Sequence, residues 1–140
     1  MPKLYFFDNG LLSSLLGIDN PKQLGIHHLK GHLFENLIIS EFYKWFTITG
    51  KKPGLYFWRE SHGNEIDCII EWGNRMISVE IKSGYSYNAE YFRHLITWQR
   101  FSETDPADFY VVYSGDLEGE MQNGSLVNWK NMMMIKEGVS

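Results

Sequence analysis

The chain reads EIDCIIEWGNRMISVEIK over residues 65–82, where two apolar-rich runs flank the pair Gly73-Asn74. A two-residue Gly-Asn loop between such runs is typical of a tight β-hairpin. We therefore predict two antiparallel strands, Glu65–Trp72 and Arg75–Lys82.

The turn fixes which residues of the two strands face each other. With Trp72 opposite Arg75, one face of the hairpin carries only apolar pairs, and a slip by one residue would mix apolar with polar positions. We expect this face to point into the core, with Cys68 as an inert packing residue. The apolar pairs are Ile70 with Ile77, Cys68 with Val79, and Ile66 with Ile81.

The opposite face of the hairpin gathers charge, because Asp67 falls opposite Glu80 and Glu65 opposite Lys82. Opposed Cβ atoms lie about 4.5–5.5 Å apart, and two carboxylates about 5 Å apart repel by roughly 3 kcal/mol at an effective dielectric constant of about 20. A divalent cation would turn this repulsion into attraction, and Mg²⁺ commonly takes one or two carboxylates and keeps several waters. The alternative is an ordinary solvated strand face. Lys82, on the same face, favours a site that holds a metal and a water.

The remaining patterns predict an α/β or α+β sandwich around a mixed sheet, which we take as an α/β fold with helices on the faces of the sheet. Apolar residues at three- and four-residue steps predict helices, and β-branched or aromatic runs between turn residues predict strands. The order is helix, three-strand meander, helix, strand. The predicted elements are a strand at Lys3–Phe7, a helix from Asp8 or Asn9 to Leu16, a helix at Gly31–Phe46, a strand at Gly54–Glu60, the hairpin, a helix from Asn88 to Phe101 and a strand at Asp108–Tyr113.

Composition sets the class of protein. The 140 residues suit a single domain, which we divide into an N-terminal segment 1–30, a core 31–113 and a tail 114–140. Apolar residues at 44% and charged residues at 21% exclude a disordered chain. The net charge of −4 argues against coating of nucleic acid by bulk charge. One cysteine, no signal-peptide pattern and no apolar run of about 18 residues lead us to expect a cytoplasmic protein without a membrane span.

Asp67 followed by Glu80-Ile81-Lys82, with Glu35 on an upstream helix, resembles the PD-(D/E)XK nuclease superfamily. The predicted order of elements is similar to its restriction-endonuclease-like core. More narrowly, the chain resembles the C-terminal domain found behind many bacterial and archaeal AAA-type ATPases. Ile66-Asp67 stands where the superfamily's name has Pro-Asp. The segments that carry the likeness are residues 3–11, 31–36, 56–59, 63–67 and 79–84.

The resemblance implies a role for each matching residue. Asp67 and Glu80 would bind Mg²⁺ or Mn²⁺, with help from Glu35, and Lys82 would position or activate the attacking water. The reaction would be hydrolysis of a phosphodiester in DNA or RNA. The chain has no G-x-x-x-x-G-K-[ST] loop and hence no ATP site of its own, so an AAA-type ATPase module is expected in cis or in trans. The alternative is a non-catalytic accessory or interaction module of such an ATPase.

Several basic residues could contact a phosphate backbone, although solvated surface charge is the alternative for each. A closed zinc site is not expected among the five histidines, because only one cysteine is present. Among the histidines, His62 in the turn before the hairpin is the candidate to lie beside the site. The basic candidates are Lys51, Lys52, Arg59, Arg93 and Arg100.

Overall fold

The computed structural model describes residues 5, 14, 16, 17, 19, 20, 22, 23, 29–52 and 54–137. The chain divides into two compact units, Met1–Pro53 and Gly54–Ser140. The predicted strand at Lys3–Phe7 and the predicted helix from Asp8 to Leu16 lie almost wholly outside the described residues.

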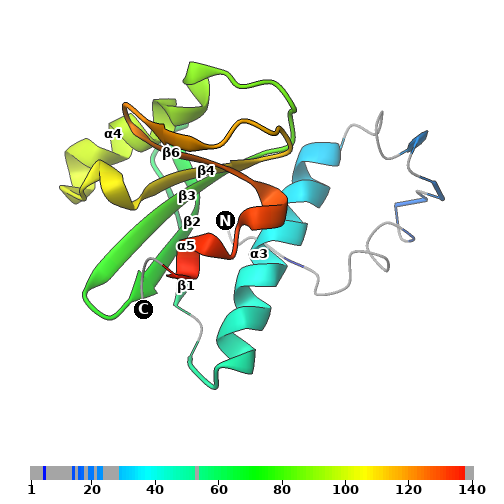
Figure 1. The fold of residues 1–140 in the computed structure, drawn as a ribbon, viewed down its shortest axis with the longest axis horizontal. Coiled ribbons are helices and arrows are strands. Elements are labelled where there is room, and N and C mark those ends of the chain that lie inside the picture. The colour runs from blue at the N-terminus through cyan, green and yellow to red at the C-terminus, as the bar shows by residue number, and fades with distance from the viewer. Residues whose placement is uncertain are drawn as a thin grey trace. The chain divides into compact units, whose positions relative to one another are not determined.

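The first unit contains the helix α3, Lys30–Ile48 (Figure 1). It confirms the helix predicted at 31–46 and extends it at both ends. Gly50 follows the helix with a φ of 72°, a left-handed conformation that commonly ends helices. Apolar side chains at three- and four-residue steps are buried, as an amphipathic helix requires. These residues are Ile38, Ile39, Phe42 and Phe46, and Leu33, five positions before Ile38, is buried as well.

The second unit is built on a six-stranded sheet (Figure 1). In chain order its strands are β1 (Leu55–Arg59), β2 (Glu65–Trp72), β3 (Arg75–Lys82), β4 (Phe109–Tyr113), β5 (Gly119–Met121) and β6 (Gly124–Asn128). Their order across the sheet is β1-β2-β3-β4-β6-β5. The first three form the predicted antiparallel meander, whereas β3, β4 and β6 run parallel. The predicted mixed α/β sheet is therefore confirmed.

A helical crossover joins β3 to β4, as a parallel pair requires. The helix predicted at 88–101 is divided into a 3₁₀ helix, η1 (Ala89–Phe92), and the helix α4 (Arg93–Ser102). Asn88 caps the first turn as predicted, because its side-chain oxygen accepts a hydrogen bond from the Glu90 N–H at 2.9 Å. The helical part of the crossover thus starts with a cap, six positions after the end of β3 at Lys82.

Helix α4 packs on the sheet through Leu95 and Trp98. Both belong to a buried cluster with Ile69 of β2 and with residues of β4 and β6. The Trp98 indole Nε1 donates a hydrogen bond to Ser78 Oγ of β3 at 2.8 Å. Consecutive residues are buried in the middle of β2 and β3, so the face of the hairpin that carries Asp67 and Glu80 is buried and is not the solvated strand face that the sequence left as the alternative.

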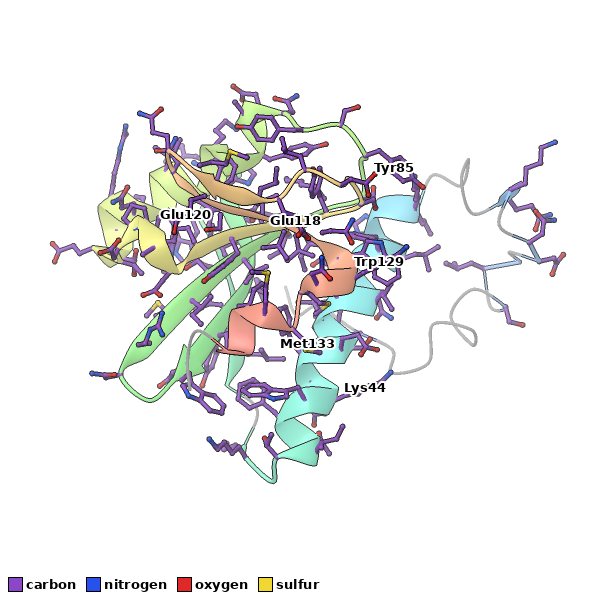
Figure 2. All side chains as sticks on the ribbon, viewed as in Figure 1. Lys44, Tyr85, Glu118, Glu120, Trp129 and Met133 are labelled. Atoms are coloured by element: carbon purple, nitrogen blue, oxygen red, sulfur yellow. The ribbon has the colours of Figure 1, made fainter. Side chains whose placement is uncertain are left out.

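The segment 114–140, predicted as a weak tail, completes the sheet instead. Strand β6 lies inside the sheet between β4 and β5, and its Leu126 and Val127 are each 1% exposed. A 3₁₀ helix, η3 (Trp129–Asn131), and the short helix α5 (Met134–Glu137) follow. The Glu118 carboxylate ties the loop after β4 to this segment (Figure 2), since it accepts hydrogen bonds from Asn128 N and Asn131 Nδ2 at 2.8 Å each.

The described helices include none that is both long and apolar enough to cross a bilayer.

Candidate active site

The β2–β3 hairpin has the predicted register over most of its length. Its paired residues run from Trp72 with Arg75 to Cys68 with Val79. The turn residue Gly73 has a φ of 62°, the left-handed conformation that a two-residue hairpin loop requires. The regular pairing stops at Cys68, one residue before the predicted Asp67–Glu80 pair.

A β-bulge in β2 coincides with the end of this pairing. Tyr56 of β1 pairs with Ile69 of β2, and Trp58 pairs with Ile66. Between these two pairs β2 therefore advances by three residues where β1 advances by two. The extra residue turns Ile66 toward α4, and Ile66 and Ile69 lie in the same buried cluster. The predicted placement of Ile66 on the Cys68 face is therefore wrong. Bulges commonly end strand pairing and redirect side chains beside active sites.

Asp67 and Glu80 close the gap that opens between the two strands. The Asp67 N–H donates to Glu80 Oε1 at 3.1 Å, and the Ile81 N–H donates to Asp67 Oδ2 at 2.8 Å. Side-chain carboxylates thus take hydrogen bonds that backbone carbonyls accept in a regular ladder. The two acids come together as predicted, but through these reciprocal bonds and not as an ordinary cross-strand pair. Asp67 is 8% exposed and Glu80 1% exposed.

Among the described residues, Lys82 supplies the positive charge nearest to Glu80. Its Nζ lies 3.3 Å from Glu80 Oε2, and its side chain is 31% exposed. At that distance two unit charges attract by about 5 kcal/mol at an effective dielectric constant of about 20. Burial of a carboxylate costs several kcal/mol unless charged and hydrogen-bonded partners offset it. The buried charge of Glu80 therefore depends on Lys82 and on the backbone donor at its other oxygen.

His94 also contacts Glu80, which the sequence did not indicate. Its Nδ1 lies 3.5 Å from Glu80 Oε2, and its side chain is 16% exposed. His94 stands in the first turn of α4, and the crossover returns that turn to the end of β3 where Glu80 lies. No spacing motif signals the contact. The topology does, because the helix after β3 must pack back on the sheet before β4 begins.

Three other residues named from the sequence have partners elsewhere. Glu65, expected opposite Lys82, instead forms an ion pair of 2.8 Å with Arg59. His62 is exposed, and its ring lies 3.4 Å from Ser61 Oγ. Glu35 is a half-buried residue of α3 in the first unit, where its Oε1 accepts a hydrogen bond from the Tyr5 hydroxyl at 3.0 Å. Its role as a metal ligand stays a prediction.

The basic candidates for phosphate contact are all on the surface. Lys51 and Lys52 are exposed after α3, and Arg59 is exposed in its pair with Glu65. Arg93 and Arg100 are exposed on α4. Arg93 is the one whose place bears on the site, because its Nη2 lies 3.2 Å from Nε2 of His94.

The donor set suits a hard cation that keeps most of its waters. Within the described part of the chain, no cluster of three or more His, Cys, Asp or Glu residues is arranged to hold a metal ion. Asp67 and Glu80 would therefore supply one or two carboxylate ligands, which is the number that Mg²⁺ commonly takes from a protein. Carboxylate oxygens also suit Mn²⁺.

Known proteins with similar sequences place the chain in a family. The family described as a domain of unknown function, DUF4143, matches residues 30–132. Two curated relatives are the uncharacterized proteins Mb2031c of Mycobacterium bovis and Rv2008c of Mycobacterium tuberculosis, each 33% identical over 81 residues, which are 58% of this chain and 18% of the relative. The matched segment is thus a small part of each relative's length. No solved structure matches significantly. Because the family match covers well over half of the sequence, the chain belongs to the DUF4143 family.

Proposed function

We propose that this chain is a Mg²⁺- or Mn²⁺-dependent nuclease domain with a restriction-endonuclease-like core. The observation that carries the proposal is the meeting of Asp67, Glu80 and Lys82 where the β2–β3 pairing ends. The site lies toward the carboxyl end of β3, which runs parallel to β4. Ligands of open α/β sheets bind outside the carboxyl ends of the strands.

Each residue has a role that its surroundings support. Asp67 and Glu80 would hold the cation through hard oxygen donors. When bound, the cation supplies Lewis-acid polarisation of the phosphate and lowers the pKa of a bound water. Lys82, with 31% of its side chain exposed, can reach both Glu80 and an arriving anion. Its ammonium would orient the water and stabilise the negative charge that gathers on the phosphate oxygens.

The proposed reaction is a hydrolysis that needs no other reactant. A water oxygen forms a bond to phosphorus while the bond from phosphorus to the leaving sugar oxygen breaks. The proton that the attacking water loses passes to solvent water, and the leaving oxygen takes a proton from solvent water. No electron is exchanged with an outside donor or acceptor.

Cleavage assays with end-labelled single- and double-stranded DNA and RNA test the proposal. The parent chain should cut at least one of these with Mg²⁺ or Mn²⁺ and none with EDTA. Asp67→Asn and Lys82→Ala should each lose about 100-fold or more in rate, the scale of removing a transition-state partner. Glu71→Gln, an exposed acid on the same strand as Asp67, is the matched control and should cut like the parent. A parent that cuts nothing, or variants as fast as the parent, would refute the proposal.

A second candidate function is a non-catalytic accessory module of an AAA-type ATPase. One observation favours it: both carboxylates already accept backbone hydrogen bonds, so the cluster can lock the bulged strands without a metal. Calorimetric titration with Mg²⁺ and Mn²⁺ separates the two functions. No heat of binding at millimolar metal, with Asp67→Asn behaving like the parent, would favour the accessory module.

A further inference from the structure

We propose that His94 is a positioning residue that holds Glu80 for metal binding, an inference that rests on the proposed nuclease function. His94 comes from α4, whereas the three residues of the proposed site come from β2 and β3. Its Nδ1 lies 3.5 Å from Glu80 Oε2. The contact therefore joins the crossover helix to Glu80, the more deeply buried of the two acids of the site.

The neighbour of His94 fixes which ring nitrogen carries the proton. Arg93 Nη2 lies 3.2 Å from His94 Nε2, and a guanidinium can only donate hydrogen bonds. Nε2 must then accept, so in the neutral ring the proton is on Nδ1, the nitrogen that faces Glu80. A histidine whose second nitrogen is engaged in this way is held in one tautomer and one orientation.

The contacts of Glu80 show why His94 matters. Glu80 Oε1 is fixed by the Asp67 N–H at 3.1 Å. Oε2 has two partners, Lys82 at 3.3 Å and His94 at 3.5 Å. In the proposed reaction Lys82 turns toward water and phosphate, and its long, half-exposed side chain allows that movement. His94 then remains the side-chain donor that keeps Oε2 in place, and Lys82 is released for the reaction.

Three substitutions of His94 separate positioning from general support of the fold. Asn places its amide near the position of Nδ1 and can keep the contact with Glu80 Oε2. Gln is longer, places its amide near the position of Nε2, and should lose the contact. Ala removes both positions. His62→Ala is the matched control, because His62 is an exposed histidine of the same unit.

The readouts are Mn²⁺ affinity by calorimetry, kcat and KM for the best nucleic-acid substrate, and the thermal unfolding midpoint. His94→Gln and His94→Ala should weaken Mn²⁺ binding or lower kcat by about 10- to 100-fold, the usual effect of removing a partner of a metal ligand. KM should change little. His94→Asn and His62→Ala should stay within about threefold of the parent. Asn and Gln should unfold at similar temperatures, so that stability does not explain their difference.

The outcomes distinguish this inference from the proposed function. If the parent binds Mn²⁺ and cuts but His94→Gln and His94→Ala do so equally well, the inference is overturned and the nuclease proposal stands. If His94→Asn is as impaired as His94→Gln, the contact from the Nδ1 position is not the cause and the inference is again overturned. If the parent neither binds Mn²⁺ nor cuts, the proposed function fails and the role of His94 fails with it. If His94→Ala does not fold, the contrast between Asn and Gln still decides.

Discussion

Replacing Lys82 by Met should destabilise the protein far more than replacing Lys44 by Met. Both lysines lie 3.3 Å from a glutamate oxygen, Lys82 from Glu80 and Lys44 from Glu41. The surroundings differ, since the side chains of Lys44 and Glu41 are 42% and 39% exposed whereas that of Glu80 is 1% exposed. Lys44, labelled in Figure 2, is thus a matched control: its distance to a glutamate oxygen is the same as that of Lys82, but its partner glutamate is exposed.

The burial of Glu80 sets the expected magnitude. Removing one partner of a buried ion pair costs about 3–5 kcal/mol, because the remaining charge stays buried without compensation. The Asp67 N–H and His94 still contact Glu80 in this variant. We therefore expect Lys82→Met to lower the free energy of unfolding by about 3 kcal/mol, at the lower end of that range. Exposed pairs on a helix contribute about 0.3–0.5 kcal/mol, so Lys44→Met should lose no more than about 0.5 kcal/mol.

Urea unfolding at pH 7, followed by circular dichroism, measures both losses. A decrease of about 3 kcal/mol corresponds to a fall of about 10 °C in the thermal midpoint for a chain of this length. The double variant Glu80→Gln, Lys82→Met should lose less than the sum of the two single variants, because it leaves no buried carboxylate at this position. Equal losses for Lys82→Met and Lys44→Met, or strict additivity in the double variant, would refute the reasoning.

Three further substitutions probe the carboxyl ends of the parallel strands. Burial raises the pKa of the Tyr113 phenol above its ordinary 10.0. The phenol therefore ionises first in the unfolded state, and the free energy of unfolding falls as the pH rises past about 10. Tyr113→Phe should make that fall smaller in urea unfolding between about pH 9 and pH 11. Gly115→Ala should lower the free energy of unfolding by about 3 kcal/mol, measured by thermal unfolding, because an added Cβ would overlap the Tyr85 carbonyl oxygen. Asn128→Ala should lower the free energy of unfolding by about 2 kcal/mol in the same assay. The substitution removes the hydrogen bond that the side-chain amide donates to Gly115 O at 2.6 Å, and it removes the side-chain cap of η3.

The hairpin could be predicted because its information is local. Gly73-Asn74 specifies the turn, and the alternation of apolar residues specifies the register. The ends of both strands agree with the structure at Glu65–Trp72 and Arg75–Lys82. Asp67, Glu80 and Lys82 are close in space for the same reason, since each is a few residues from a turn whose geometry is fixed.

The bulge and His94 depend on segments that the hairpin sequence does not contain. The bulge at Asp67-Cys68 is defined by pairing with β1, which comes from outside the hairpin. His94 reaches Glu80 only because α4 folds back over the sheet. Strand β6 was not predicted because its only apolar residues in sequence are Leu126 and Val127. Both are buried, so the strand lacks the alternation of apolar and polar residues that marks a half-exposed strand.

Crystals of the chain grown with Mn²⁺ would test the central claim directly, since anomalous scattering locates manganese without assumptions about activity. The account predicts an anomalous peak within coordination distance of a carboxylate oxygen of both Asp67 and Glu80, and loss of that peak in Asp67→Asn. A peak bound elsewhere, or none between these two side chains at saturating Mn²⁺, would contradict it.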